Sequence, residues 1–171
     1  MSDRWSWLAG TFWIVPEANL AAPMFSTSGG DPVWLLDQTV WQITGYADGY
    51  FWGNTAAQMM RRPEGDDDAT PSAQLLTGSV TPEGSIHMTF VPLSSTGGGS
   101  NVIGIGNMRR RDESWMAEMQ MSTPVGSTQL VLHWAYMVQC TPDDPTWHQL
   151  PGTTQSLPEF LRAAGFHVVE T

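Results

Sequence analysis

The sequence predicts an all-β fold, an antiparallel up-and-down barrel of about eight strands followed by a short C-terminal helix. Short segments in which apolar and polar residues alternate recur along most of the chain. Turn-forming residues such as Gly, Pro and Asp separate most of these segments by short intervals. Successive hairpins form a meander that closes into a barrel, whereas a sandwich requires longer crossovers between its sheets. The 171 residues are therefore expected to form a single barrel domain, residues 1–171.

The N-terminal elements follow from where the apolar runs stop. A first strand is expected over residues 11–15, because Pro16 ends the run. Residues 17–32 are rich in Pro, Gly and Ser and are expected to form a long loop over one mouth of the barrel.

Residues 61–73 are expected to form a mobile acidic loop. The three aspartates within it, residues 66–68, are not expected to bind a metal, since consecutive carboxylates do not converge on one ion without other ligands.

A hairpin is expected to join the next two strands, residues 33–45 and 50–60. The connecting Asp48-Gly49 is a strong hairpin signal because both residues tolerate a left-handed backbone. If the turn centres near Ala47, four side chains share one face: Trp41, Ile43, Trp52 and Asn54.

The rest of the chain contains five further strands and a tail. The strands are expected over residues 75–80, 85–91, 101–108, 114–121 and 129–139. Pairing around the turn at residues 81–84 is expected to place Leu75, Thr77 and Ser79 beside Ile86, Met88 and Phe90. In the tail, residues 141–171, Ser156 and Glu159 have the spacing of a capping box and begin a helix through Ala164, and residues 167–169 are expected to add a short strand.

The charge balance excludes several classes of function. The chain has a formal net charge of −10, from 17 acidic and 7 basic residues, and it contains no lysine. A surface of this sign repels phosphate groups, so neither nucleic acid nor an anionic membrane is an expected partner. The absence of lysine excludes a Schiff base and a phosphate-loop lysine.

The cysteine count and the apolar runs suggest a compartment. Cys140 is the one cysteine, so neither an internal disulfide nor a thiolate metal cluster is expected. No apolar run approaches about 18 residues, and the first residues do not resemble a signal peptide. These features predict a cytoplasmic protein, and the sequence leaves open whether it forms a homodimer.

The first predicted strand resembles the opening of a known group of barrels. Leu8-Ala9-Gly10-Thr11-Phe12-Trp13 is similar to the Gly-x-Trp opening of the calycins, the group of lipocalins, avidins and fatty-acid-binding proteins, although Phe12 holds the place of the tryptophan. The segment Asp48 to Gly53 resembles the polar-Gly-aromatic ladders of avidin-like barrels. The resemblance implies a closed calyx around an apolar ligand and implies no particular chemistry.

Large apolar side chains are unusually common, with nine tryptophans and ten methionines. Packing alone rarely requires so many indole groups, which favours a cavity with aromatic walls over a solid core. Nine residues are candidates for binding a ligand there: Trp41, Trp52, Trp115, Trp134, Met88, Phe90, Met119, Asn54 and His87.

Four polar residues are candidates for catalysis. Asp37 and Glu118 have apolar neighbours on predicted strands, and an inward carboxyl group in an apolar barrel has a raised pKa and can act as a general acid. The alternative is that both mark the wet outer face. His133 is a candidate acid–base group, and Tyr136 is a candidate for orienting a carbonyl group.

Two main functions are consistent with these residues. The first is binding of a small, largely apolar or aromatic molecule inside the barrel. The second is a cofactor-independent cyclase, isomerase or lyase that acts on a polyene, polyketide or phenolic substrate in the same cavity. A third alternative is haem binding through His87 or His133; otherwise no cofactor and no metal are expected.

Overall fold

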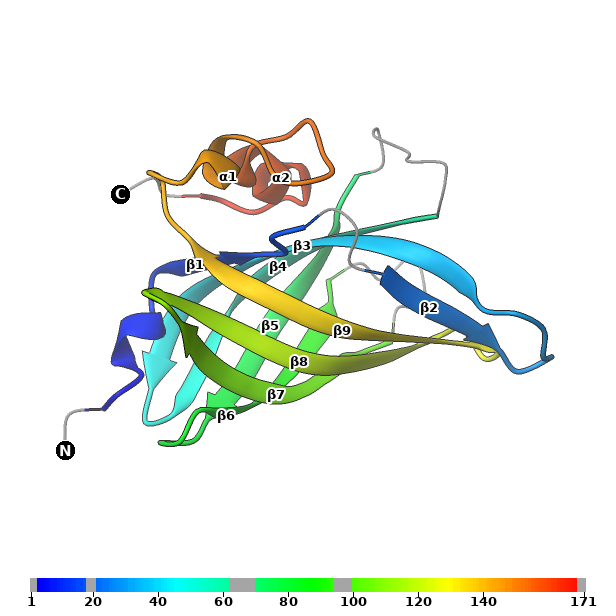
Figure 1. The fold of residues 1–171 in the computed structure, drawn as a ribbon, viewed down its shortest axis with the longest axis horizontal. Coiled ribbons are helices and arrows are strands. Elements are labelled where there is room, and N and C mark those ends of the chain that lie inside the picture. Colours follow the sequence, from blue (N-terminus) through cyan, green and yellow to red (C-terminus); the bar gives the residue numbers. More distant parts are fainter. Residues whose placement is uncertain (1–2, 18–20, 62–69, 94–99, 169–171) are drawn as a thin grey trace.

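A computed structural model of the protein, which describes residues 3–17, 21–61, 70–93 and 100–168, confirms the all-β fold (Figure 1). The strands wrap into a closed barrel, and two short helices lie against its outside. The strands are β1 (Thr11–Ile14), β2 (Ala21–Ser26), β3 (Val33–Ala47), β4 (Tyr50–Arg61), β5 (Ser72–Val80), β6 (Ser85–Pro92), β7 (Val102–Arg111), β8 (Ser114–Val125) and β9 (Gln129–Cys140).

The barrel closes through one position that two strands share. From β3 to β9 each strand pairs with the next in antiparallel order, as the predicted meander requires. Both β1 and β2 lie between β3 and β9: β1 pairs with one end of each and β2 with the other end. The nine strands therefore fill eight positions of a closed barrel.

The prediction of a continuous loop over residues 17–32 is wrong. Within that range, β2 pairs with β3 through Ala22 and Leu35 and with β9 through Met24 and Val131. The Pro and Ser content concealed a strand that is stabilised by its two neighbours in the sheet rather than by local propensity.

The β3–β4 hairpin confirms the turn signal and corrects the predicted face. Asp48 and Gly49 have φ angles of 49° and 87°, as a tight turn with two left-handed residues requires. A bulge between Ile43 and Gly45 then shifts the register, so that Ile43 pairs with Gly53 and Trp52 pairs with Gly45. Trp52 consequently lies on the outer face, opposite to the expectation.

The predicted register of the β5–β6 hairpin is also wrong, by one residue. Ser85 begins β6 but pairs only with β7; its carbonyl oxygen accepts from the N–H of Thr81 across the turn, so the innermost pair of β5 and β6 is Val80 with Ile86. Because side chains alternate between the faces of a strand, this shift places Leu76 beside Phe90 and directs both inward.

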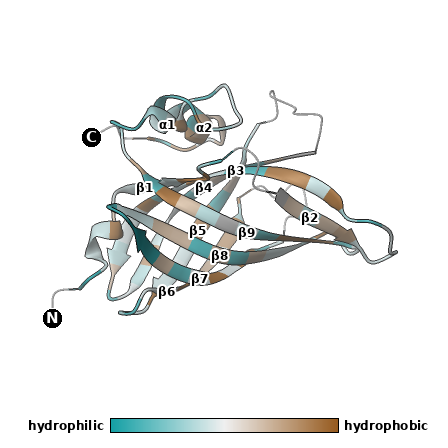
Figure 2. Ribbon diagram, viewed as in Figure 1, coloured by the Kyte–Doolittle hydropathy of each residue, from teal (hydrophilic) through white to brown (hydrophobic). Residues whose placement is uncertain are grey.

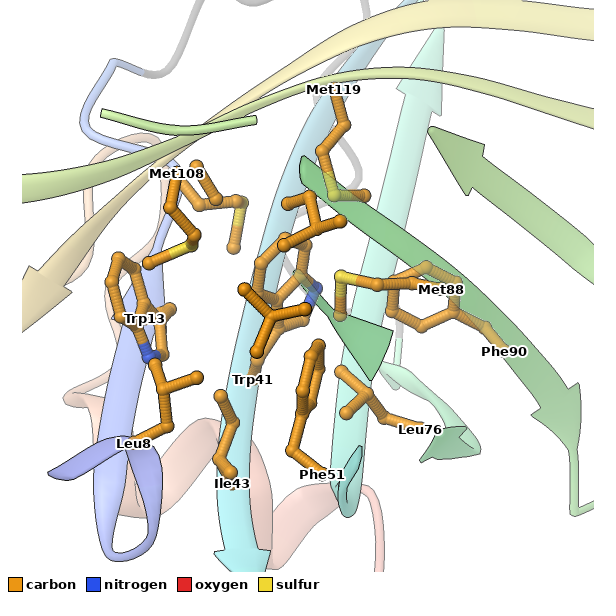
Figure 3. Packing of buried hydrophobic residues seen from close by; sticks show 14 of the residues in the cluster. Leu8, Trp13, Trp41, Ile43, Phe51, Leu76, Met88, Phe90, Met108 and Met119 are labelled. Carbon is orange, nitrogen blue, oxygen red and sulfur yellow. The ribbon is translucent and has the colours of Figure 1, made fainter. Parts of the chain in front are cut away.

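One end of the barrel is closed by the N-terminal segment. The 3-10 helix η1 (Ser6–Leu8) lies across this end, and Trp5 and Leu8 are buried in the barrel core. The indole N–H of Trp5 donates to the carbonyl oxygen of Thr81 at 2.8 Å, which ties the segment to the β5–β6 turn. Behind it, Trp13 on β1 fills the barrel interior (Figure 3). The structure is compatible with the calyx that the resemblance of this segment implies.

The C-terminal tail covers part of the outside of the barrel. Helices α1 (Pro145–His148) and α2 (Leu157–Ala163) pack on outward residues of the sheet, among them Ile14, Val40 and Ala56. The predicted capping box is confirmed, because the Ser156 hydroxyl accepts from the N–H of Glu159 while the Glu159 carboxylate accepts from the N–H of Ser156. The predicted terminal strand is not formed at residues 167–168, and residue 169 lies outside the described residues.

Hydropathy along the strands follows their two faces. Figure 2 shows apolar and polar residues alternating along β8 and β9, as alternating inward and outward positions require. Within the described residues, no helix is both long enough and apolar enough to cross a membrane.

Candidate functional site

The barrel interior is hollow at the end opposite to η1. A cavity of about 680 Å³ occupies this half and opens past the strand ends at Ser72, Pro92 and Val125. In the half next to η1, a void between the packed side chains measures only about 10 Å³. A volume of several hundred Å³ is typical of sites for small molecules. The cavity is therefore the candidate functional site.

The cavity exists because the inward side chains become small halfway along the strands. On β3 the inward positions change from Ile43 and Trp41 to Thr39. On β4 they change from Phe51 to Thr55 and Ala57. Eight strands enclose a space that only large side chains fill, so small ones leave it open.

The two sides of the cavity differ in polarity. The side formed by β3, β4 and β9 carries polar side chains, among them Asp37, Thr39, Thr55 and His133. The side formed by β6, β7 and β8 is mainly apolar and carries Phe90, Val102 and Met121, together with Thr123. A molecule in the cavity therefore meets hydrogen-bonding groups on one side and an apolar surface on the other.

Asp37 and His133 form a close pair within the polar side. Oδ2 of Asp37 lies 3.8 Å from Nδ1 of His133, and both side chains are buried. The other carboxyl oxygen, Oδ1, accepts a hydrogen bond from the hydroxyl of Thr39 at 2.8 Å. Since Nδ1 is turned towards the carboxyl group, the rest of the imidazole ring is what His133 presents to the cavity.

The split strand explains how this pair meets. The last pair of β1 with β3 is Ile14 with Val40, and the first pair of β2 with β3 is Ala21 with Leu36. Neither Asp37 on β3 nor His133 on β9 pairs with a residue of β1 or β2. Among the described residues, no paired residue of β1 or β2 therefore lies between the two, and the side chains of Asp37 and His133 approach each other there.

Burial controls the protonation of Asp37. Removal of the carboxyl group from water raises its pKa above the usual 3.8, because the charged form loses hydration. The nearby His133 and the hydrogen bond from Thr39 favour the charged form and oppose this effect. Burial is the largest of these effects, so the pKa of Asp37 is raised on balance.

Several buried polar atoms of the described residues lack a hydrogen-bond partner in the protein. Oδ2 of Asp37, Nδ1 of His133 and Oγ1 of Thr55 belong to residues that line the cavity, and Nε1 of Trp41 belongs to a ring that lies against the lining residue Phe90. Buried polar groups are nearly always hydrogen-bonded, because an unpaired one costs about 1–3 kcal/mol. Their grouping in one place indicates that the cavity accepts hydrogen-bonding groups.

Some of the sequence-predicted site residues lie inside the barrel. Asp37, His133 and Phe90 line the cavity itself. Four others belong to the packed core rather than to the lining, although Trp41 contacts Phe90: Trp41, Met88, Met119 and Trp115. Trp115 lies at the closed end, where its ring stacks on Trp7 at a centroid distance of 5.5 Å.

The remaining predicted site residues lie on the outer face of the barrel, so their expected inward orientation is wrong. Trp52, Trp134 and His87 are exposed. Asn54 donates to the side chain of Gln42 on the neighbouring strand. Strand alternation places each of these side chains on the opposite side of the sheet from the cavity.

Two catalytic candidates share this outward placement. Glu118 forms an ion pair with Arg109 at 2.6 Å, and Asn107, its pairing partner on β7, is exposed as well. The hydroxyl of Tyr136 donates to the sulfur of Met116. The alternative that Glu118 marks the wet face is therefore the one that matches the structure.

Sequence reasoning missed the small cavity residues Thr39, Thr55, Ala57 and Val102. Each lies an even number of residues from a large inward residue on its own strand and so points to the same face. Thr39 is related to Trp41 in this way, and Thr55 to Phe51. Counting in steps of two from those large inward residues therefore identifies the small residues that face the cavity.

Neither a metal nor a haem is favoured by the described residues. No group of three or more His, Cys, Asp or Glu side chains gathers among them, and the three aspartates 66–68 lie outside the described residues. Of the two histidines considered as haem ligands, His87 is outward and only His133 lines the cavity. No arginine is among the described lining residues to pair with the carboxylates of a haem.

Comparison with known proteins finds no match: no family model, no curated protein and no solved structure is similar to the chain. The calycin-like family therefore stays a prediction, and the proposals below depend on the geometry of the barrel.

Proposed function

We propose that the protein binds a small, largely apolar or aromatic molecule inside the hollow half of the barrel. The observation that carries this proposal is the contrast between a cavity of about 680 Å³ at one end and a packed core at the other. Proteins fill their interiors closely when nothing else does so, and a persistent large void loses dispersion contacts on every side. The affinity is expected to come from apolar contacts with Phe90, Val102 and Met121.

Titration with methylnaphthalene, a neutral and fluorescent aromatic molecule, tests this proposal. We expect saturable binding of one molecule per chain, measured by isothermal titration calorimetry, because the cavity holds a volume typical of small-molecule sites. The variant Ala57→Phe fills the cavity and is expected to lose binding at least about tenfold while it still folds. The matched control is Trp134→Ala on the exposed outer face. Equal binding to wild type and to Ala57→Phe would contradict a site inside the cavity.

A second candidate function is cofactor-independent proton transfer on the bound molecule, as in a cyclase, isomerase or lyase. The specific observation in its favour is the pairing of Asp37 with His133 inside the cavity. A carboxyl group beside Nδ1 orients an imidazole, and an oriented imidazole in a site that excludes water is an effective general base.

Proton exchange distinguishes a catalyst from a carrier. Acetonaphthone carries acidic methyl protons beside its carbonyl group, and their exchange in D2O can be followed by NMR. A catalyst is expected to accelerate this exchange, with a loss of about 10²-fold or more in His133→Phe and no change in Glu118→Gln, which lies outside the cavity. Binding without acceleration over buffer supports a carrier.

A further inference from the structure

The polar side of the cavity indicates which end of a ligand it recognises. Asp37 Oδ2, His133 Nδ1 and Thr55 Oγ1 are buried and have no hydrogen-bond partner in the protein. The side chains of Asp37 and Thr55 are among the most buried polar groups of the chain, with residue exposures of 3% and 1%. Groups so placed need a partner from within the cavity.

The charge of this polar side constrains that partner. An ionised Asp37 beside a protonated His133 is neutral as a pair, and so is a protonated Asp37 beside a neutral His133. No arginine is among the described residues that line the cavity, and the chain contains no lysine. A carboxylate or phosphate of a ligand would therefore enter a low-dielectric site without a compensating cation, at a high desolvation cost.

The opposite side restricts the rest of the ligand. Phe90, Val102 and Met121 present only apolar atoms to the cavity from their side chains, and the hydroxyl of Thr123 on the same side donates to the carbonyl oxygen of Pro124. A polar group there would lose its hydration without compensation. A ligand that satisfies both sides is apolar over most of its surface and carries its polar atoms at one edge.

We infer that the molecule bound in the cavity is uncharged and carries a hydroxyl or carbonyl oxygen, which hydrogen-bonds within the group formed by Asp37, His133 and Thr55. Phenols, alcohols and ketones of apolar molecules belong to this class, whereas fatty acids and other anions do not. This inference rests on the proposed function, because it names the chemical class of ligand for the same cavity.

Three ligands that differ in one substituent test this inference: naphthol, methylnaphthalene and naphthoate. They share one ring system and carry a neutral hydroxyl group, a methyl group of similar size and a carboxylate. With wild-type protein at neutral pH we expect naphthol to bind about tenfold more tightly than methylnaphthalene, because one buried hydrogen bond is gained. Naphthoate is expected to bind most weakly of the three.

Variants locate the source of this preference. Thr55→Val and His133→Phe are expected to bring naphthol to the affinity of methylnaphthalene, while the affinity for methylnaphthalene itself changes less than about threefold. Thr77→Val makes the same change as Thr55→Val at an exposed position of β5 and is expected to keep the preference. Circular dichroism checks that each variant folds, and Thr55→Val, which keeps the shape of the side chain, decides the test if His133→Phe does not fold.

The possible results separate this inference from the proposed function. Equal affinities of wild type for naphthol and methylnaphthalene, or tightest binding of naphthoate, would overturn the inference and leave the apolar binding site in place. Failure of all three ligands to bind would overturn the proposed function and the inference together. A preference for naphthol that persists unchanged in Thr55→Val and in His133→Phe would overturn the assignment to this group of residues.

Discussion

The two halves of the barrel interior are built from the same strands, yet one is filled and the other is hollow. In the half next to η1, Trp13, Trp41 and Phe51 pack against methionines with a void of only about 10 Å³ (Figure 3). In the other half, inward threonine and alanine side chains surround a cavity of about 680 Å³. The filled half stabilises the fold, and this stability allows the hollow half to carry polar and loosely packed groups.

The largest expected effect comes from removing a side chain of the filled half. Trp13 is 1% exposed, and Trp13→Ala is expected to lower the free energy of unfolding by about 3–5 kcal/mol, because a large cavity replaces close contacts. Trp134→Ala is the matched control at a residue that is 65% exposed, with an expected change below about 0.5 kcal/mol. Urea denaturation measures both. Similar losses in the two variants would mean that the two tryptophans do not differ in burial as described.

Adding the same side chain to each half sharpens the comparison. Ala117→Phe overfills the packed core and is expected to destabilise the protein by about 3 kcal/mol. Ala57→Phe enters the cavity and is expected to change stability by less than about 1 kcal/mol, since no packed side chain needs to move. A large loss of stability in Ala57→Phe, seen as a lower urea midpoint than in wild type, would show that the cavity is smaller than described.

The polar side of the hollow half is expected to reduce stability as the pH rises. Burial raises the pKa of Asp37 in the folded state above its usual 3.8, so the folded protein keeps its proton where the unfolded chain has lost it. The resulting stabilisation is complete below the pKa that Asp37 has in the unfolded chain. It is lost as the pH rises from that value through the pKa that Asp37 has in the folded protein. Over this range, wild type is expected to lose about 1.4 kcal/mol per pH unit relative to Asp37→Asn, whose side chain does not titrate.

Urea unfolding of wild type and Asp37→Asn at several pH values above about 4 measures this difference. Asp48→Asn, at the exposed β3–β4 turn, is the control and is expected to follow wild type in parallel. If His133 instead dominated the environment of Asp37, wild type would gain stability over Asp37→Asn as the pH rises, which is the opposite sign.

The smallest expected effect lies on the outer face of the barrel. Glu118 is half-exposed in its ion pair with Arg109, so Glu118→Gln is expected to lower stability by less than about 1 kcal/mol. Its binding of methylnaphthalene is expected to equal that of wild type, because the ion pair lies outside the cavity. Reduced binding in this variant, measured by the same calorimetric titration, would indicate that the outer face contributes to the site.

The architecture of the barrel was predictable because it depends on local signals. Alternation within each strand and the Asp48-Gly49 turn establish a meander, and the Ser156–Glu159 capping box begins the last helix as predicted. The strand β2 was not predictable in this way, because its residues form a strand only through pairing with β3 and β9.

The site was only partly predictable, because register decides which side chains face inward. Asp37 and His133 were identified from their apolar neighbours, and the structure brings them together across an interruption in the wall. Trp52 was assigned to the wrong face because a bulge after Ile43 changes the alternation. Thr39 and Thr55 carry no motif, and they matter only because larger residues stand at the equivalent positions in the filled half.

A crystal structure of the protein with naphthol tests the central claim most directly. We predict electron density for one naphthol molecule inside the hollow half, with its ring against Phe90 and Val102 and its oxygen within hydrogen-bond distance of the polar side. Density for naphthol only on the outer face, or protein side chains that fill the space in which we describe a cavity, would contradict the claim.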